Sequence, residues 1–403
     1  MLADLRALAE LTGNERGAQR VAWTDTWAKA REWESGLLAE LPVSVDVDEA
    51  GNQWATLEGE SAQTLIIGSH IDSVPDGGWL DGCLGVLSAL EVLRGLARNG
   101  RPPLTVKLID WADEEGARFG LSLLGSTMTT SGLEPDYVRA LRDVGGMTAG
   151  EALAAHGVEV ERMAQARSRL DQAVAYIELH IEQGPVLEAR DLPLGVVRGC
   201  YGTERWEVRF AGQAAHSGST PMDQRRDSLL AAARVALEVR ELARRLGGVG
   251  TTGRISSEPG IPTAVAGVST LLVDQRHEDP EVLGELHEQA VQASRRIAAE
   301  EDVEVSWSPL FRIAPIPFDP SLIESAAAIV NDIQGTDVRL PSGPLHDAAR
   351  VAEFGVPTVM LFVRSKRGLS HTKEEDTDEA DLALALNALD RLVHERLAQG
   401  TRS

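Results

Sequence analysis

The sequence predicts an α/β protein in which a domain with a mostly parallel sheet is interrupted by a smaller, inserted α+β domain. Two observations predict this. Short apolar strand-like stretches alternate with amphipathic helical stretches in the first half of the chain, an order typical of parallel sheets. The alternation stops near residue 203 and resumes near residue 310. We therefore expect one domain over residues 1–202 and 310–403 and a second over residues 203–309.

The first domain should begin its alternation after residue 60. The stretches TLIIGSH, LTVKLIDWADEEG and AVAYIELHIEQG predict strands at residues 64–70, 104–116 and 173–184, and LGVLSALEVLRGLARNG predicts a helix at 84–100. In sheets of this type functional groups collect where strands end and loops begin. His70, Glu114, Glu115 and His180 all lie at such ends.

The inserted domain has a different pattern. Strands are expected at residues 204–212, 264–277 and 303–309, with long helices at 225–247 and 279–301. A proline-rich connection, FRIAPIPFDP, follows at residues 311–320. The αβ alternation then resumes with residues 321–333, a strand at 356–365 and a helix at 378–400.

Composition excludes several classes of function. The chain has 403 residues and a formal net charge of -23, which argues against binding to nucleic acids or anionic membrane surfaces. No apolar run approaches the ~20 residues of a membrane span, and the first residues lack the features of a signal peptide. We expect a cytoplasmic protein. Cys83 and Cys200 are not in a CxxC motif, so we expect free thiols and assign them no role.

The stretch GSHIDSVPDGGWLDGCLGV, residues 68–86, places a histidine and carboxylates in a glycine-rich loop after an apolar strand. His70 and Asp72 are two residues apart, so on an extended end they share a side, and Asp72 can accept the second N–H of a metal-bound imidazole. Asp81 follows in a turn that glycines can fold around an ion. The alternative is a strand-to-helix loop in which Asp76 and Asp81 merely cap backbone amides.

Three further stretches supply candidate ligands. In WADEEGARFG, Glu114 and Glu115 point to different sides, so one can bind a metal while the other carries a proton; the alternative is a solvated surface. His180 in ELHIEQGP and His371 in GLSHTKEED also follow apolar strands, although lone histidines in such places are commonly core residues. Five potential ligands at comparable strand ends favour a metal site: His70, Asp81, Glu115, His180 and His371.

This set of imidazoles and carboxylates without thiolates suits Zn, Mn, Co or Ni. Five ligands suit two divalent ions per subunit better than one, and Asp81 can bridge them. A bridged pair of ions lowers the pKa of a shared water and stabilises a tetrahedral intermediate.

The motifs GSHIDSV…GGWLDG, DEEGARF…GS, ELHIEQGPVLE, AAHSGSTPMDQRRD and GLSHTKEEDT, in this order over residues 68–377, resemble the amidase, hydantoinase and carbamoylase family of binuclear metallohydrolases. The resemblance implies a metal-binding catalytic α/β domain with an inserted lid that also forms a homodimer. It implies the five residues above as ligands, Glu114 as general base and acid, Asp72 as the residue that orients His70, and Gln183 in the substrate site. His216 would reach the active site of the partner subunit and polarise the scissile carbonyl; the alternative is a turn residue fixed by Gly218 and Pro221.

The resemblance also suggests a substrate with a ureido or amide group and a carboxylate. Arg276 matches an arginine that holds the carboxylate in relatives; the alternative is a surface ion pair. Thr263 stands where relatives carry asparagine, Ala266 replaces a proline, Pro344 and Leu345 precede His346 in the substrate region, and Arg364 replaces another proline. We expect hydrolysis of an N-carbamoyl-L-amino acid. The alternatives are allantoate, another N-acyl amino acid or amide, and a catalytically silent metal-binding protein.

Overall fold

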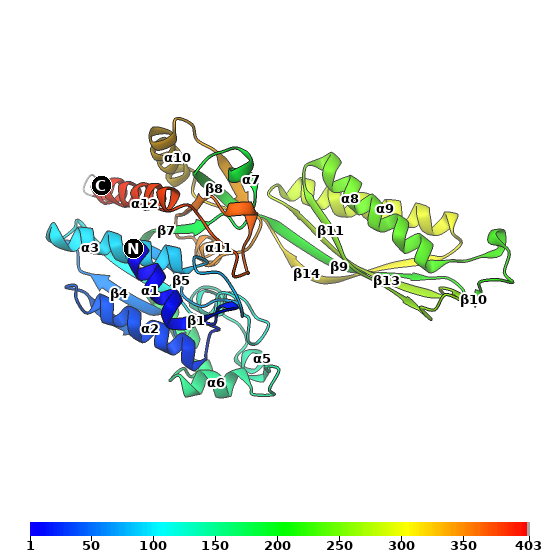
Figure 1. Ribbon diagram of the computed structural model, residues 1–403, viewed down its shortest axis with the longest axis horizontal. Coiled ribbons are helices and arrows are strands. Elements are labelled where there is room, and N and C mark those ends of the chain that lie inside the picture. Colours follow the sequence, from blue (N-terminus) through cyan, green and yellow to red (C-terminus); the bar gives the residue numbers. More distant parts are fainter. Residues whose placement is uncertain (401–403) are drawn as a thin grey trace. The chain divides into compact units, whose positions relative to one another are not determined.

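The computed structural model describes residues 1–400, which form two compact units. The first comprises Met1–Arg198 and the chain from Phe318 onward, and the second comprises Gly199–Pro317. The first contains a large mixed sheet with helices packed on it, and the second contains an antiparallel sheet with two long helices (Figure 1). The predicted fold class is confirmed. Within residues 1–400, no helix combines the length and apolar character needed to cross a bilayer.

The large sheet has nine strands. In spatial order they run β15-β8-β17-β7-β5-β6-β4-β3, with β16 paired to β8. Their bounds are Ser44–Val47 (β3), Gln53–Leu57 (β4), Ser61–His70 (β5), Leu104–Trp111 (β6), Ala173–Ile181 (β7), Leu194–Cys200 (β8), Ile316–Pro317 (β15), Arg339–Ser342 (β16) and Thr358–Val363 (β17). Along this order the four central strands β17, β7, β5 and β6 pair parallel to one another, and the strands outside them pair antiparallel.

The register of these four strands brings their carboxyl ends to one edge of the sheet. His70, the last residue of β5, is opposite Trp111, the last residue of β6. His180 of β7 is opposite Phe362 of β17. The loops that leave these strands therefore start side by side, as expected for parallel strands.

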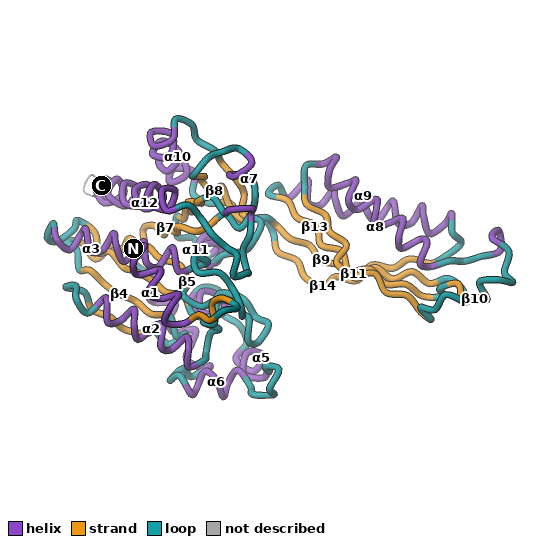
Figure 2. Tube along the Cα trace, in the orientation of Figure 1, coloured by secondary structure: helices purple, strands orange, loops and turns teal. Residues whose placement is uncertain are grey.

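Helices pack against this sheet (Figure 2). α3 contacts β5, β6 and β7, and its nearly continuous buried surface fits the apolar sequence from which it was predicted. α12 contacts β7 and β17, and α11 also contacts both strands. The helices of this unit are Leu2–Thr12 (α1), Asp25–Leu38 (α2), Cys83–Arg98 (α3), Leu124–Thr129 (α4), Pro135–Ala140 (α5), Ala149–Ala155 (α6), Val186–Ala189 (α7), Pro320–Gln334 (α10), Asp347–Glu353 (α11) and Glu379–Gly400 (α12), with 3-10 turns at Val160–Leu170 (η1) and Lys366–Gly368 (η3) and a short hairpin of β1 (Gly13–Asn14) and β2 (Gly17–Ala18).

The second unit is a four-stranded antiparallel sheet in the order β11-β13-β9-β14. Its strands are Gly202–Ala211 (β9), Val249–Glu258 (β11), Val268–His277 (β13) and Glu304–Ile313 (β14), and its helices are Ser228–Leu246 (α8) and Pro280–Glu300 (α9). The two helices lie side by side along the sheet (Figure 1). Val208, Phe210 and Leu271 are fully buried between these layers. A short pair, β10 (Ala215–His216) and β12 (Ala264–Val265), and the turn η2 (Met222–Gln224) complete the unit.

The structure differs from the sequence prediction at some elements. β11 was not expected, because its glycines, serines and threonines resemble a loop. β14 continues to Ile313, so part of the predicted proline-rich connection is a strand. The bulge at Pro309 explains this, since an edge strand tolerates a proline that cannot donate to a neighbour.

Candidate metal centre

The loops at the carboxyl edge of the large sheet bring together His70, Asp81 and His180. Asp81 Oδ1 lies 3.8 Å from His70 Nε2 and 3.2 Å from His180 Nε2. The two imidazole rings are stacked with their centres 5.9 Å apart. All three residues are buried, and their potential ligand atoms lie within 4.8 Å of one another.

The other carboxylate oxygen of Asp81 faces a second group of potential ligands. Asp81 Oδ2 lies 3.5 Å from His371 Nε2, which in turn lies 3.4 Å from Glu115 Oε2. These three residues also have potential ligand atoms within 4.8 Å of one another. Asp81 thus belongs to both groups and presents one oxygen to each. All five expected ligands are brought together in the first unit.

The chemistry of these residues fits a metal cation. His70 Nδ1 lies 3.1 Å from the carbonyl oxygen of Asp72, and His180 Nδ1 lies 2.9 Å from that of Ile181. Because a carbonyl can only accept, each Nδ1 carries a hydrogen, so Nε2 is the ring nitrogen whose lone pair can be offered to an ion that displaces a proton. Among residues 1–400, neither His180 Nε2 nor Glu115 Oε1 has a hydrogen-bond partner, although both atoms are buried. One cation in each ligand group would satisfy these atoms.

Asp72 holds the turn that carries the two glutamates. Its Oδ1 accepts a hydrogen bond from the backbone N–H of Glu114, and its Oδ2 accepts one from Glu115, each at 3.2 Å. Asp72 Oδ1 also lies 3.5 Å from His70 Nδ1. A single buried carboxylate therefore links the His70 strand end to the loop after β6.

A glycine allows the loop after β5 to pass close to His70. Gly82 precedes α3 with φ of 65°, a left-handed conformation that favours glycine. A Cβ atom at this position would overlap the His70 ring. Glycine at position 82 is therefore required by the close approach of the loop to the imidazole.

Glu114 lies beside the first group. Its Oε2 is 3.7 Å from His70 Nε2, and the residue is buried. Burial raises the pKa of Glu114 well above its ordinary value; nearby His70 opposes this, and the charges of Asp347, Glu115 and Asp72 add to it. A carboxyl group with a raised pKa is suited to exchange a proton near neutral pH.

The centre concentrates negative charge. Burial raises the pKa of Glu115 well above its ordinary value, and the charge of Asp81 adds to the increase. Burial alone would lower the pKa of His70, but the carboxylates of Glu114 and Asp72 override it and hold the pKa well above the ordinary value. Neighbouring carboxylates thus add to the effect of burial at Glu115 and oppose it at His70, and a divalent cation would neutralise part of this negative charge.

Two expected substrate residues also lie in the first unit. Gln183 has φ of 56°, and its Nε2 donates a hydrogen bond to Asp81 Oδ2 at 2.9 Å. His346 precedes α11 and is 2% exposed. Its ring centre lies 4.5 Å from that of His180, and its Nε2 lies 3.0 Å from Ser342 Oγ. Burial, with the charge of His180, lowers the pKa of His346 well below its ordinary value, so this ring is neutral.

The other three expected residues lie in the second unit. His216 is exposed in β10, and its Nδ1 accepts a hydrogen bond from the Gly218 N–H at 3.0 Å, which leaves the hydrogen of the neutral ring on Nε2. Thr263 accepts a hydrogen bond from Ser217 N through its backbone oxygen. Arg276 Nε donates to Asp274 Oδ1 at 2.7 Å.

Comparison with known proteins identifies the family. The model of a family described as Peptidase family M20/M25/M40 matches residues 66–395, which is most of the chain. The chain belongs to this family. Members of the M20/M25/M40 family are metal-dependent hydrolases, in agreement with the ligand groups around Asp81.

Named relatives agree with this assignment. An N-carbamoyl-L-amino acid amidohydrolase of Geobacillus stearothermophilus is 34% identical over 390 residues, covering 95% of this chain and 94% of that protein. The allantoate amidohydrolase of Escherichia coli K12 is 33% identical over 384 residues, covering 94% and 93%. A crystal structure of an amidase of the hydantoinase/carbamoylase family from Burkholderia multivorans superposes with a TM-score of 0.88 at 32% identity, covering 98% of this chain and 96% of that one. The resemblance inferred from the motifs is confirmed.

Sequence reasoning missed several buried groups around the centre of this M20/M25/M40 protein. Glu178 accepts hydrogen bonds from Ser69 Oγ at 2.7 Å and Tyr176 Oη at 2.9 Å. Ser126 Oγ donates to Asp347 Oδ1 at 2.5 Å. Glu178 lies two residues from His180 and Asp347 directly follows His346, so their position beside histidines in the sequence was the available signal.

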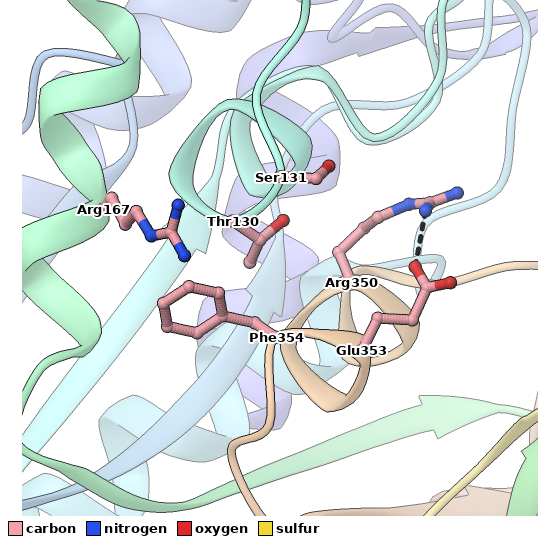
Figure 3. Close-up of a pocket in the computed structure, with 6 residues that line it drawn as sticks. All are labelled: Thr130, Ser131, Arg167, Arg350, Glu353 and Phe354. Atoms are coloured by element: carbon pink, nitrogen blue, oxygen red, sulfur yellow. Dashed lines mark hydrogen bonds and ion pairs between the residues drawn. The ribbon is translucent and has the colours of Figure 1, made fainter.

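One cavity of the first unit contains none of the expected site residues. It has a volume of about 420 Å³ and is lined by Thr130, Ser131, Arg167, Arg350, Glu353 and Phe354 (Figure 3). Arg350 pairs with Glu353 at 2.6 Å, and the Arg167 guanidinium lies 4.8 Å from the centre of the Phe354 ring. Both guanidinium groups are thus engaged within the pocket, and we assign it no part in the chemistry.

Proposed function

We propose that this protein hydrolyses N-carbamoyl-L-amino acids to the amino acid, ammonia and carbon dioxide. One observation carries the proposal: Asp81 presents an oxygen to each of two ligand groups, and Glu114 lies beside one of them with a raised pKa. The choice of substrate is supported by relatives named N-carbamoyl-L-amino-acid amidohydrolases.

Two divalent ions per subunit, drawn from Zn, Mn, Co and Ni, would be held by these groups. His70 and His180 would hold one, Glu115 and His371 the other, and Asp81 would bridge them. Nitrogen and oxygen donors without sulfur suit this choice of metals. When bound, such a pair lowers the pKa of water and polarises a carbonyl oxygen.

The protein's own residues would move the protons. Glu114 takes a proton from the attacking water and returns it to the leaving nitrogen of the substrate, which its raised pKa permits. Asp72 keeps Glu114 and Glu115 in place through their backbone amides. The carbamate released from a carbamoyl group then decomposes to ammonia and carbon dioxide.

The second unit would contribute the remaining residues. We propose that it acts as the lid and dimerisation domain, and that His216 donates its Nε2 hydrogen to the developing oxyanion in the active site of the partner subunit. Arg276 would bind the substrate carboxylate, with Thr263 in place of an amide side chain. Gln183 and His346 would shape the substrate site around the metals.

Allantoate is the second candidate substrate. A relative of nearly equal coverage is named allantoate amidohydrolase, and the departures at Thr263 and Leu345 fall in the substrate region rather than at the ligands. Allantoate also carries a ureido group and a carboxylate, so the same residues could act on it.

Ammonia release separates these possibilities. Metal-stripped protein is reloaded with Zn²⁺ or Mn²⁺ and incubated with N-carbamoyl-L-amino acids, 3-ureidopropionate and allantoate, with N-acetyl amino acids monitored for free amine. We expect metal-dependent ammonia release from N-carbamoyl-L-amino acids that is lost in Glu114→Gln. Turnover of allantoate or N-acetyl compounds alone would refute N-carbamoyl-L-amino acids as the substrate. Metal binding without any turnover would indicate a catalytically silent metal-binding protein.

A further inference from the structure

A buried glutamate outside the expected ligand set joins the loop of Asp81 to the loop of His371. Glu375 is 2% exposed. Its Oε1 accepts hydrogen bonds from the backbone N–H groups of Leu80 and Asp81, each at 3.0 Å. Its own backbone N–H donates to the Thr372 carbonyl at 3.0 Å, which fixes the turn after His371. Glu375 therefore ties together two segments that are almost three hundred residues apart in sequence.

The second carboxylate oxygen of Glu375 extends this link to the Asp81 side chain. Ser370 Oγ lies 3.0 Å from Glu375 Oε2 and 2.7 Å from Asp81 Oδ2. Because a hydroxyl has one hydrogen, it can bond to only one of the two carboxylates at a time. Ser370 directly precedes His371, so the same contact places the His371 backbone beside Asp81.

The Asp81 loop is shaped to receive this carboxylate. A Cβ atom at Gly78 would overlap the Glu375 carboxylate, so only glycine leaves room for it. Oε1 of Glu375 accepts from two backbone amides, and Oε2 faces the Ser370 hydroxyl, which it shares with Asp81. Glu375 is therefore placed to hold loops and not to bind an ion.

We infer that Glu375 is a positioning residue that aligns Asp81 and His371 for the ion shared between Asp81, Glu115 and His371. This inference rests on the proposed two-metal function. His371 needs such support more than the other histidines, because its side chain is 51% exposed and its φ of 58° is left-handed. Carboxylates that orient metal ligands commonly change metal affinity about 10- to 100-fold when removed.

Two conservative substitutions separate the reach of Glu375 from its charge. Glu375→Asp keeps the charge but shortens the side chain, so its carboxylate cannot reach Leu80, Asp81 and Ser370 together. Glu375→Gln keeps the length, and its amide oxygen can accept the same two backbone N–H groups. Glu374→Asp is the matched control, because Glu374 is exposed in the same turn and its carboxylate accepts from Thr372.

Metal-free forms of the full chain are titrated with Zn²⁺ against a chromophoric chelator, and the visible absorption of the Co²⁺-loaded forms is recorded. We expect wild type, Glu374→Asp and Glu375→Gln to bind two ions with similar affinities. In Glu375→Asp the dissociation constant of one of the two ions should rise about 10- to 100-fold, with a changed Co²⁺ spectrum. Thermal unfolding of the metal-free proteins shows that each variant is folded.

The outcomes distinguish this inference from the proposed function. Wild-type protein that binds no ion, or only one, would refute the two-metal proposal itself. Two ions in wild type with unchanged binding in Glu375→Asp would refute positioning alone. Weaker binding in Glu375→Gln with unchanged binding in Glu375→Asp would also refute it, since charge and not reach would then be the cause.

Discussion

Replacing Asp72 with asparagine tests whether a buried carboxylate sets the geometry of the metal centre. Asp72 accepts one backbone N–H on each oxygen, from Glu114 and Glu115, both at 3.2 Å. Asparagine has one acceptor oxygen, so its NH₂ group must face one of these N–H groups. One bond to a charged acceptor is lost, and a buried donor is left without a partner.

The size of the effect follows from these bonds. A hydrogen bond to a charged group contributes about 1.5–3 kcal/mol, and about 1.4 kcal/mol corresponds to a factor of ten. Because the affected amides belong to Glu114 and Glu115, we expect the Asp72→Asn protein to lose about 10- to 100-fold in metal affinity, the range known for residues that orient ligands. The value of kcat/KM at saturating metal should fall as well, since Glu114 shifts with the turn.

The assay is chelator competition with Zn²⁺, followed by turnover at saturating metal. Asp76→Asn is the matched control, because Asp76 lies in the same loop but is partly exposed and bonds to the side chain of Gln19. Asp72→Asn protein that binds metal and turns over substrate like wild type would show that the two amide bonds do not set the geometry.

Three further results are expected. Glu114→Gln should keep its metal and lose about 10²- to 10⁴-fold in kcat, the usual contribution of a general acid–base; retained turnover would exclude Glu114 from proton transfer. Burial raises the pKa of the Cys83 thiol to about 11, so a thiol reagent at pH 8 should modify Cys83 only after denaturation, and rapid modification of Cys83 in the native protein, located by peptide mapping, would contradict its burial. Phe210→Ala should lower the unfolding free energy of the second unit by about 3–5 kcal/mol, because Phe210 is fully buried. Denaturant titration measures this loss, with Arg209→Ala, at an exposed neighbour, as the control. A loss in Phe210→Ala no larger than that in Arg209→Ala would contradict the prediction.

The sequence predicted those helices and strands whose hydrophobic pattern agrees with their burial in the structure. β5, β6, β7 and β17 are buried along most of their length, so continuous apolar runs in the sequence predicted them as strands. α8 and α9 have buried residues at helical spacing and begin at Asp227 and Asp279, whose side chains accept from the first-turn amides. β11 was not predicted because none of its residues is fully buried, and its pairing to β13 supplies the order that its composition does not.

The residues of the candidate site also differ in whether the sequence could predict them. His70 and His180 end or nearly end apolar strands, so their approach could be inferred from parallel pairing alone. Glu375 could not be inferred, because acidic residues surround it in TKEED and nothing local separates the buried glutamate from its exposed neighbours. Its burial is decided by Leu80 and Asp81, which lie far away in the sequence.

Glycines in the sequence do not mark every position of this site that has a left-handed backbone conformation. Asp113, Gln183 and His371 adopt left-handed φ values of 60°, 56° and 58°, although none is glycine. Such conformations cost about 1–3 kcal/mol each and persist only where surrounding contacts impose them. At Gln183 the contact is the bond to Asp81, and at His371 it is the neighbouring Ser370 between two carboxylates. At Gln183 and His371 the side chain needed at the proposed site therefore takes precedence over the residue that the backbone would favour, and contacts with Asp81 offset the strain.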